Sequence, residues 1–162
     1  MRRFLPVALL ALLGCGDAHF GQVWSGSKDI LRNATKVEAA LLVVPDGPSG
    51  KPGEPDYWSW PRKGAPVARD AATSKRVADL LLDEKSYYRG APKKCLPMPG
   101  VQIRFDRGTS SASVLFCLEC RILFVRSPGG QVGMDDFDPA APALLEIVKK
   151  LFPADPVIQR LR

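Results

Sequence analysis

The stretch that most constrains the fold covers residues 95–125, which read CLPMPGVQIRFDRGTSSASVLFCLECRILFV. It holds every cysteine of the chain except Cys15, and it is the densest apolar region after the N-terminus. Residues 101–105 alternate apolar and polar side chains. Successive side chains on a strand point to opposite faces, so this alternation predicts a strand with one wet face. The polar residues 106–111 have the composition of a loop.

The apolar run at residues 114–125 is longer than one ordinary strand, which has about 5–6 residues. We therefore expect two strands that meet where Cys117 and Cys120 form a Cys-x-x-Cys pair. Leu118-Glu119 is a poor two-residue hairpin turn, because neither residue favours a positive φ. One long strand with a bulge or bend is the alternative.

The N-terminus has the pattern of a secretory signal peptide. Arg2 and Arg3 precede an apolar run at residues 4–13, and this run is shorter than the about 20 residues that a membrane-spanning helix needs. The run ends in Leu12-Leu13-Gly14-Cys15, which resembles the lipobox of bacterial lipoproteins. An ordinary signal peptide followed by a stray cysteine is the alternative.

The lipobox resemblance implies cleavage before Cys15, with acyl chains such as palmitate on its sulfur and on the new amino terminus. Several acyl chains on one residue anchor a protein stably, whereas a single chain is marginal, so membrane lipid is the first expected partner. In the sorting rule of lipoproteins an Asp directly after the cysteine retains the protein at the inner membrane. Here Gly16 follows, and Asp17 comes only after it. The protein is thus expected in the cell envelope, at the outer membrane and facing the periplasm.

The resulting division of the chain has three parts. Residues 1–14 are the signal peptide, residues 15–35 are the lipidated cysteine and a flexible tether, and residues 36–162 form one domain. Within the tether, a short turn of helix is expected near residues 29–32, with Ser27 as its cap. The first strand is expected at residues 36–44, where both faces are apolar beyond Glu38, as in an interior strand.

Between this strand and the first helix lies a proline-rich segment at residues 45–66, which is expected to be mostly loop. A short edge strand at residues 56–60 would place Trp58 and Trp60 on one face. Such an aromatic pair caps a core in most proteins, and in some it stacks on a sugar or a base.

Two principal helices are predicted. The first covers residues 70–83, with Asp70 or Thr73 as its cap and an inner face of Val77, Leu80 and Leu81. The second opens at Asp138-Pro139, stops at Pro153, and has an apolar face of Leu144, Ile147, Val148 and Leu151. Together the elements predict a single α+β domain with a four- to five-stranded, mostly antiparallel sheet and two main helices on one face.

Cys95, Cys117 and Cys120 remain after lipidation of Cys15. Exported proteins favour disulfides, and with an odd number of cysteines at least one stays free or pairs with another molecule. If the strands form a meander, all three sulfurs meet at one end of the sheet. We expect Cys95 to be bonded to Cys117 or Cys120, with the third cysteine buried.

Two alternatives give these cysteines a chemical role. Cys117-x-x-Cys120 is the spacing of thiol–disulfide exchange sites, although redox pairs of the thioredoxin type open a helix and this pair lies among strand-forming residues. Three thiolates could also hold zinc with a fourth ligand. The only histidine, His19, lies in the expected tether and is a poor candidate for that ligand.

Beyond the lipobox, the chain resembles a set of small exported bacterial proteins of unknown function. The resemblance rests on four features, which are Ser86-Tyr87, Cys95 followed by Pro99-Gly100-Val101, the Cys117-x-x-Cys120 pair, and Leu151-Phe152-Pro153. It implies no activity, but it favours treating the three cysteines as one unit.

Composition and missing motifs narrow the function. The net charge of +6 is scattered rather than gathered into a basic stripe, which argues against nucleic-acid binding. No histidine falls in the expected domain, so a hydrolytic triad is disfavoured, and no cofactor motif points to a bound cofactor. We expect a non-catalytic binding or structural module with an envelope protein as a candidate partner, and a redox or zinc-binding lipoprotein as the alternative.

Overall fold

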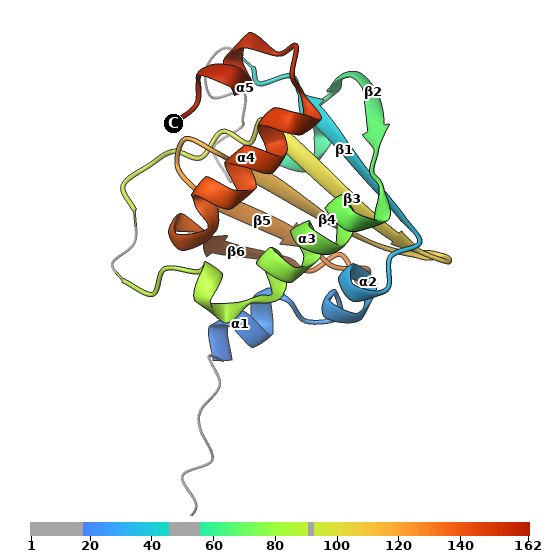
Figure 1. The fold of residues 1–162 in the computed structure, drawn as a ribbon. Coiled ribbons are helices and arrows are strands. Elements are labelled where there is room, and N and C mark those ends of the chain that lie inside the picture. Colours follow the sequence, from blue (N-terminus) through green and yellow to red (C-terminus); the bar gives the residue numbers. More distant parts are fainter. Residues whose placement is uncertain (1–17, 46–55, 91–92) are drawn as a thin grey trace, which may run out of the picture.

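The computed structural model describes residues 18–45, 56–90 and 93–162. The signal peptide and the lipobox with Cys15 lie outside the described residues. The fold is α+β, with one open antiparallel sheet in the strand order β2-β1-β3-β4-β5-β6 (Figure 1). The strands are β1 Lys36–Leu42, β2 Arg62–Ala68, β3 Val101–Arg107, β4 Ser110–Cys117, β5 Ile122–Arg126 and β6 Val132–Asp136. The predicted α+β class is confirmed, but the predicted count of four to five strands is wrong, because the sheet has six.

Helices cover one face of this sheet. The two longest, α3 Ala71–Leu82 and α4 Ala141–Leu151, cross it side by side (Figure 1). Shorter helices α1 Ala18–Val23 and α2 Lys28–Arg32 lie at one end of the molecule, and α5 Pro156–Arg160 lies at the other. Three 3-10 turns complete the elements: η1 Tyr57–Ser59, η2 Glu84–Ser86 and η3 Asp138–Ala140. The expected pair of main helices is therefore present, but with three short helices beside it.

The hairpin of β3 and β4 is longer than the sequence indicated. Asp106 pairs with Ser111 and Arg107 with Ser110, so the turn consists only of residues 108–109. Gly108 has a φ of +56°, which glycine adopts without steric cost. The polar residues that predicted a loop are thus mostly strand residues at the exposed end of the hairpin.

The second hairpin confirms two strands at the Cys-x-x-Cys pair and excludes a single bent strand. Cys117 pairs with Ile122, which leaves a four-residue turn at residues 118–121. Arg121 takes the positive φ of +56°. The turn therefore does not depend on Leu118-Glu119 alone, which is why the hairpin forms despite their poor turn propensity.

Neither of the two outer strands, β2 and β6, was predicted from the sequence. β2 falls in the proline-rich segment, where Gly64 and Pro66 interrupt any alternation. Proline has no amide to donate, so it is tolerated at the edge of a sheet, and the pairing of β1 with β2 shifts register between Ala39 and Leu41. The prediction of an edge strand at residues 56–60 is wrong. That segment forms η1, whose first turn is capped when the Asp56 carboxylate accepts a hydrogen bond from the Trp58 amide.

The N-terminal segment differs most from expectation. Residues 18–35, expected as a flexible tether with one helical turn near residues 29–32, carry both α1 and α2. Helix α2 lies at the expected turn, although the Ser27 side chain makes no capping hydrogen bond, and α1 was not predicted. Their apolar side chains are buried in the core beneath the helices, namely Phe20, Val23, Trp24, Ile30 and Leu31. Gly21, Ser25, Gly26 and Ser27 interrupt the segment, and helices of six and five residues are too short to display a clear 3.6-residue period.

The two long helices largely follow their predicted patterns. Asp70 caps α3 by accepting a hydrogen bond from the Thr73 amide at 2.8 Å, and the buried face of α4 is the predicted one. The start of α4 differs, since Asp138 and Pro139 form the turn η3 and the helix begins at Ala141. The Asp138 carboxylate instead lies 2.9 Å from the Lys93 ammonium.

Candidate functional site

The face of the sheet opposite α3 and α4, called here the open face, is divided into an apolar half and a polar half. The apolar half is a small buried cluster of Leu42, Tyr57, Leu115, Cys117, Cys120, Ile122 and Phe124. The polar half begins two residues further along each strand, at the next side chain on the same face. There Arg104 of β3 lies opposite Ser113 of β4, which lies opposite Arg126 of β5. Alternation on the strands therefore brings these three polar side chains into one row.

The segment around η1 covers the apolar half. The Tyr57 ring is buried, lies 4.9 Å from the Phe124 ring, and meets the Trp60 ring edge-on at 5.2 Å. Trp58 and Trp60 are half-buried against the same cluster. The core-capping interpretation of these aromatic residues thus describes their packing, while both indoles also form the wall of an adjacent groove.

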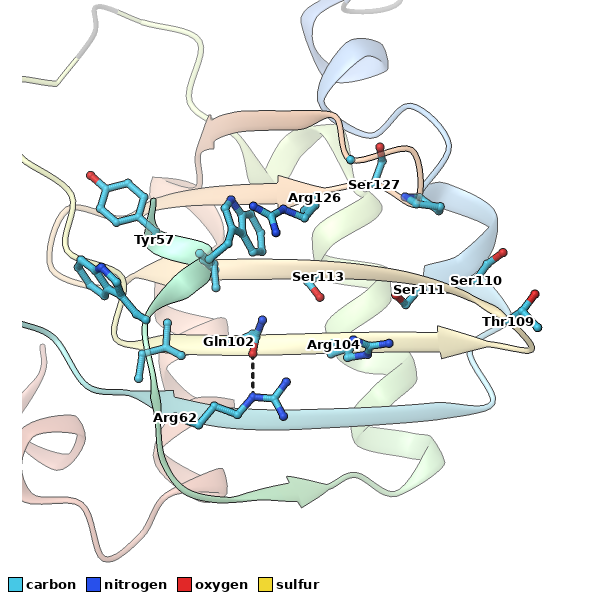
Figure 2. A pocket seen from close by; sticks show the side chains of 16 residues that line it. Tyr57, Arg62, Gln102, Arg104, Thr109, Ser110, Ser111, Ser113, Arg126 and Ser127 are labelled. Carbon is cyan, nitrogen blue, oxygen red and sulfur yellow. Dashed lines mark hydrogen bonds between the residues drawn. The ribbon is translucent and has the colours of Figure 1, made fainter. Parts of the chain in front are cut away.

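The groove has a volume of about 560 Å³ and runs along the polar half of the open face (Figure 2). Hydroxyl and amide side chains line much of it, including Gln102, Thr109, Ser110, Ser111 and Ser113. Three arginines come from three different strands, with Arg62 on β2, Arg104 on β3 and Arg126 on β5. The lining can therefore donate many hydrogen bonds and carries positive charge.

Each arginine is held in a different way. The Arg62 Nε donates to the Gln102 side-chain oxygen at 3.2 Å (Figure 2), and within the described residues no carboxylate lies within 4 Å of its guanidinium. The Arg104 Nε donates to Asp106 at 2.8 Å. The Arg126 guanidinium lies 4.4 Å from the centre of the Trp58 ring and 3.8 Å from Asp56. Of the three, Arg62 brings the charge that protein carboxylates compensate least.

The structure places the predicted cysteines at the apolar end of the open face. Cys95 and Cys120 form a disulfide with their Cα atoms 6.1 Å apart. Cys117, at the end of β4, is a free thiol that is 2% exposed, and its sulfur accepts a hydrogen bond from the Met98 amide at 3.2 Å. The disulfide fastens the segment before β3 to the turn between β4 and β5.

The disulfide argues against both chemical roles considered for the cysteines, thiol–disulfide exchange and zinc binding. Cys117 and Cys120 are not bonded to each other, because Cys120 forms its disulfide with Cys95. Among residues 18–45, 56–90 and 93–162, no group of three or more metal-ligating side chains is close enough to hold an ion. A zinc site would need all three thiolates, and the disulfide takes two of them.

His19 lies close to Asp135 and lines a surface hollow that also contains Cys95. The Asp135 side chain is 3% exposed, accepts a hydrogen bond from Arg89 at 2.7 Å, and lies 3.9 Å from the His19 Nε2. Burial, with the Asp135 charge as a second cause, holds the pKa of the neighbouring Tyr87 hydroxyl well above its usual value. That hydroxyl donates to the Leu81 carbonyl of α3 at 2.6 Å, so it is engaged within the fold rather than presented to solvent as a proton donor.

The groove was not predicted from the sequence. Its arginines are single residues on separate strands, and isolated arginines on a wet strand face have the same pattern as ordinary solvated charge. The one usable signal was the alternation at residues 101–105, which places Gln102 and Arg104 on the same face. Nothing local indicated that Arg62 and Arg126 would join them.

Comparison with protein-family models, with curated proteins and with solved structures gave no match. The lipobox and the resemblance to small exported proteins therefore stay predictions. None of the helices in the described part combines the length and the apolarity that crossing a bilayer requires.

The cysteine arrangement predicts the outcome of thiol counting on a Cys15→Ser protein. We expect no reactive thiol in the folded protein and one after denaturation without reductant, because only the buried Cys117 is unbonded. Closing a loop of 25 residues should stabilise the fold by about 3 kcal/mol. Cys95→Ser should therefore lower the free energy of unfolding by that amount without reductant, and change it little in strong reductant.

Cys117→Ala is the matched control, since it should abolish the thiol signal and leave the effect of reductant on stability unchanged. Three thiols after denaturation without reductant would contradict the disulfide.

Proposed function

We propose that this protein is a lipid-anchored, non-catalytic binding module of the bacterial cell envelope, held by acylated Cys15, and that the open-face groove is its ligand site. The observation that carries the ligand site is the convergence of three arginines and an indole wall on one polar groove. Charged and aromatic side chains gathered in a concave site are the usual elements of ligand recognition.

The ligand class that fits the groove best is an anionic saccharide. Guanidinium groups pair with carboxylate or phosphate in a two-pronged geometry, and the charge of Arg62 is open to such a partner. Neutral hydroxyl and amide groups, including Gln102 and Ser113, suit the many hydroxyls of a sugar. The indoles of Trp58 and Trp60 offer flat apolar surface to its CH groups.

A redox function through Cys117 and Cys120 has less support. Thiol–disulfide exchange needs an accessible thiolate, whereas Cys117 is 2% exposed. Its sulfur also accepts a hydrogen bond from a backbone amide within a packed cluster, which is typical of a structural cysteine.

The anchor is tested by Cys15→Ser. The wild-type protein should incorporate labelled palmitate and fractionate with membranes, while the variant should do neither, because the sulfur that carries the acyl chain is gone. Its circular dichroism spectrum and melting temperature should match those of the domain released from wild-type protein. Persistence of the variant in membranes at high salt would show that the lipobox interpretation is wrong.

The ligand site is tested by titrating the Cys15→Ser protein with polygalacturonate and with uncharged dextran, using tryptophan fluorescence. Polygalacturonate should give a saturable change and dextran a much weaker one, because only the former offers carboxylates to the arginines. Arg62→Gln should weaken binding by about tenfold, the value expected for loss of one charge-assisted hydrogen bond of about 1.5 kcal/mol.

Arg76→Gln provides the matched control, since Arg76 is a half-exposed arginine on α3, on the other face of the sheet. Equal effects of the two substitutions, or no saturable signal with polygalacturonate, would count against the groove as a site for anionic saccharides.

A further inference from the structure

The distance between the anchor and the fold is short. Ala18 is the first residue of α1, and only Gly16 and Asp17 separate it from Cys15. Consecutive Cα atoms are 3.8 Å apart, so the Cα atoms of Cys15 and Ala18 can be at most about 11 Å apart. An acylated Cys15 therefore leaves the start of α1 no room to move far from the lipid headgroups.

The start of α1 is also fixed to the sheet. Phe20 and Val23 are buried in the core, and α1 lies beside β6 (Figure 1). The approach is so close that a Cβ atom on Gly133 would lie 2.7 Å from the Val23 Cα. An anchor that restrains α1 thus restrains the whole end of the molecule that contains α1 and β6.

This end exposes large apolar side chains. On β6, Val132 and Met134 are each 53% exposed, and Tyr88 is 48% exposed. Met134 and Tyr88 line one surface hollow with His19 of α1, and Val132 lines a second hollow with Ala18. Three exposed apolar residues therefore flank the helix that follows the anchor.

The charges beside this surface are already compensated. The Arg89 guanidinium is paired with Asp135 at 2.7 Å, and the Lys93 ammonium is paired with Asp136 at 2.8 Å. Attraction to anionic lipid is therefore not the main expected force. Apolar and amphipathic side chains favour the headgroup region of a bilayer even without net charge.

We propose that the end formed by α1 and β6 lies against the bilayer, with Tyr88, Val132 and Met134 in contact with the headgroup region of neutral lipid. This inference rests on the proposed acylation of Cys15. It gives the protein a fixed orientation on the membrane, with α5 at the end that points away (Figure 1).

The test uses the full lipidated protein in phosphatidylcholine nanodiscs that contain a small fraction of lipid with a gadolinium chelate on its headgroup. Paramagnetic relaxation is measured at methyl groups and at backbone amides. The enhancement at Val132 and Met134 should exceed that at Val157 several-fold, and should persist at high salt. Val157 is the matched control, because it is a 61% exposed valine of α5 at the opposite end.

A variant separates contact from mere proximity. Val132→Thr with Met134→Gln should lower the enhancement at the Gly133 amide, whereas Val157→Thr should leave it unchanged. Equal enhancement at both ends of the wild-type protein, or no response to the double substitution, would overturn the inference.

Two further outcomes are distinguishable. Protein that does not co-elute with nanodiscs would contradict acylation of Cys15, and the inference would fall with the proposed function. Protein that co-elutes but pairs through β6, with two copies per particle and no enhancement at Met134, would overturn this inference alone and leave the anchor intact.

Discussion

The rest of the structure depends on the burial of strand β4 on both faces. Val114 and Phe116 face the helices, Leu115 and Cys117 face the other way, and none of these four is more than 2% exposed. A strand that is apolar on both sides needs cover on both sides, since each large apolar side chain gains about 1.5–3 kcal/mol when it leaves water. One layer of helices can protect only half of it.

The two faces are covered by different means. On the helix side, α3 and α4 are joined by the N-terminal segment, whose turn between α1 and α2 contributes Trp24 to the same core. On the open face, the segment around η1 covers only the half that contains Phe124. The disulfide between Cys95 and Cys120 fastens the chain at that end. Among the described residues the polar half has no such cover, and the groove lies there because hydroxyl and guanidinium side chains replace apolar ones along β3 and β4.

Helices and strands with a strong periodic pattern could be predicted from the sequence, and those with a weak pattern could not. The α3 and α4 helices follow from their 3.6-residue apolar patterns, with a correctly predicted cap only for α3, and β3 follows from clean alternation. The outer strands β2 and β6 were missed because edge strands need neither apolar alternation nor a complete set of amides, as Pro66 shows.

Helix α1 and the burial of α2 in the core were not predicted, for another reason. Their stability comes from tertiary burial of a few anchors such as Trp24, not from local propensity. The groove combines residues of β2, β3 and β5, so it follows from sheet topology and register, which no local pattern encodes. The cysteines could be assigned to one cluster from strand order, but the turn at Arg121 decides that Cys120 rather than Cys117 meets Cys95.

The central claim is that the chain folds as one unit from Ala18 onward, so that the expected long tether is part of the core. Hydrogen exchange of the Trp24 and Leu31 amides tests it directly, because they donate to Phe20 and Ser27 within the N-terminal segment. In the lipidated protein we expect both to exchange slower than an unstructured chain by at least on the order of a hundredfold. Exchange of both at the unstructured rate, while the β3 and β4 amides stay protected, would contradict the account.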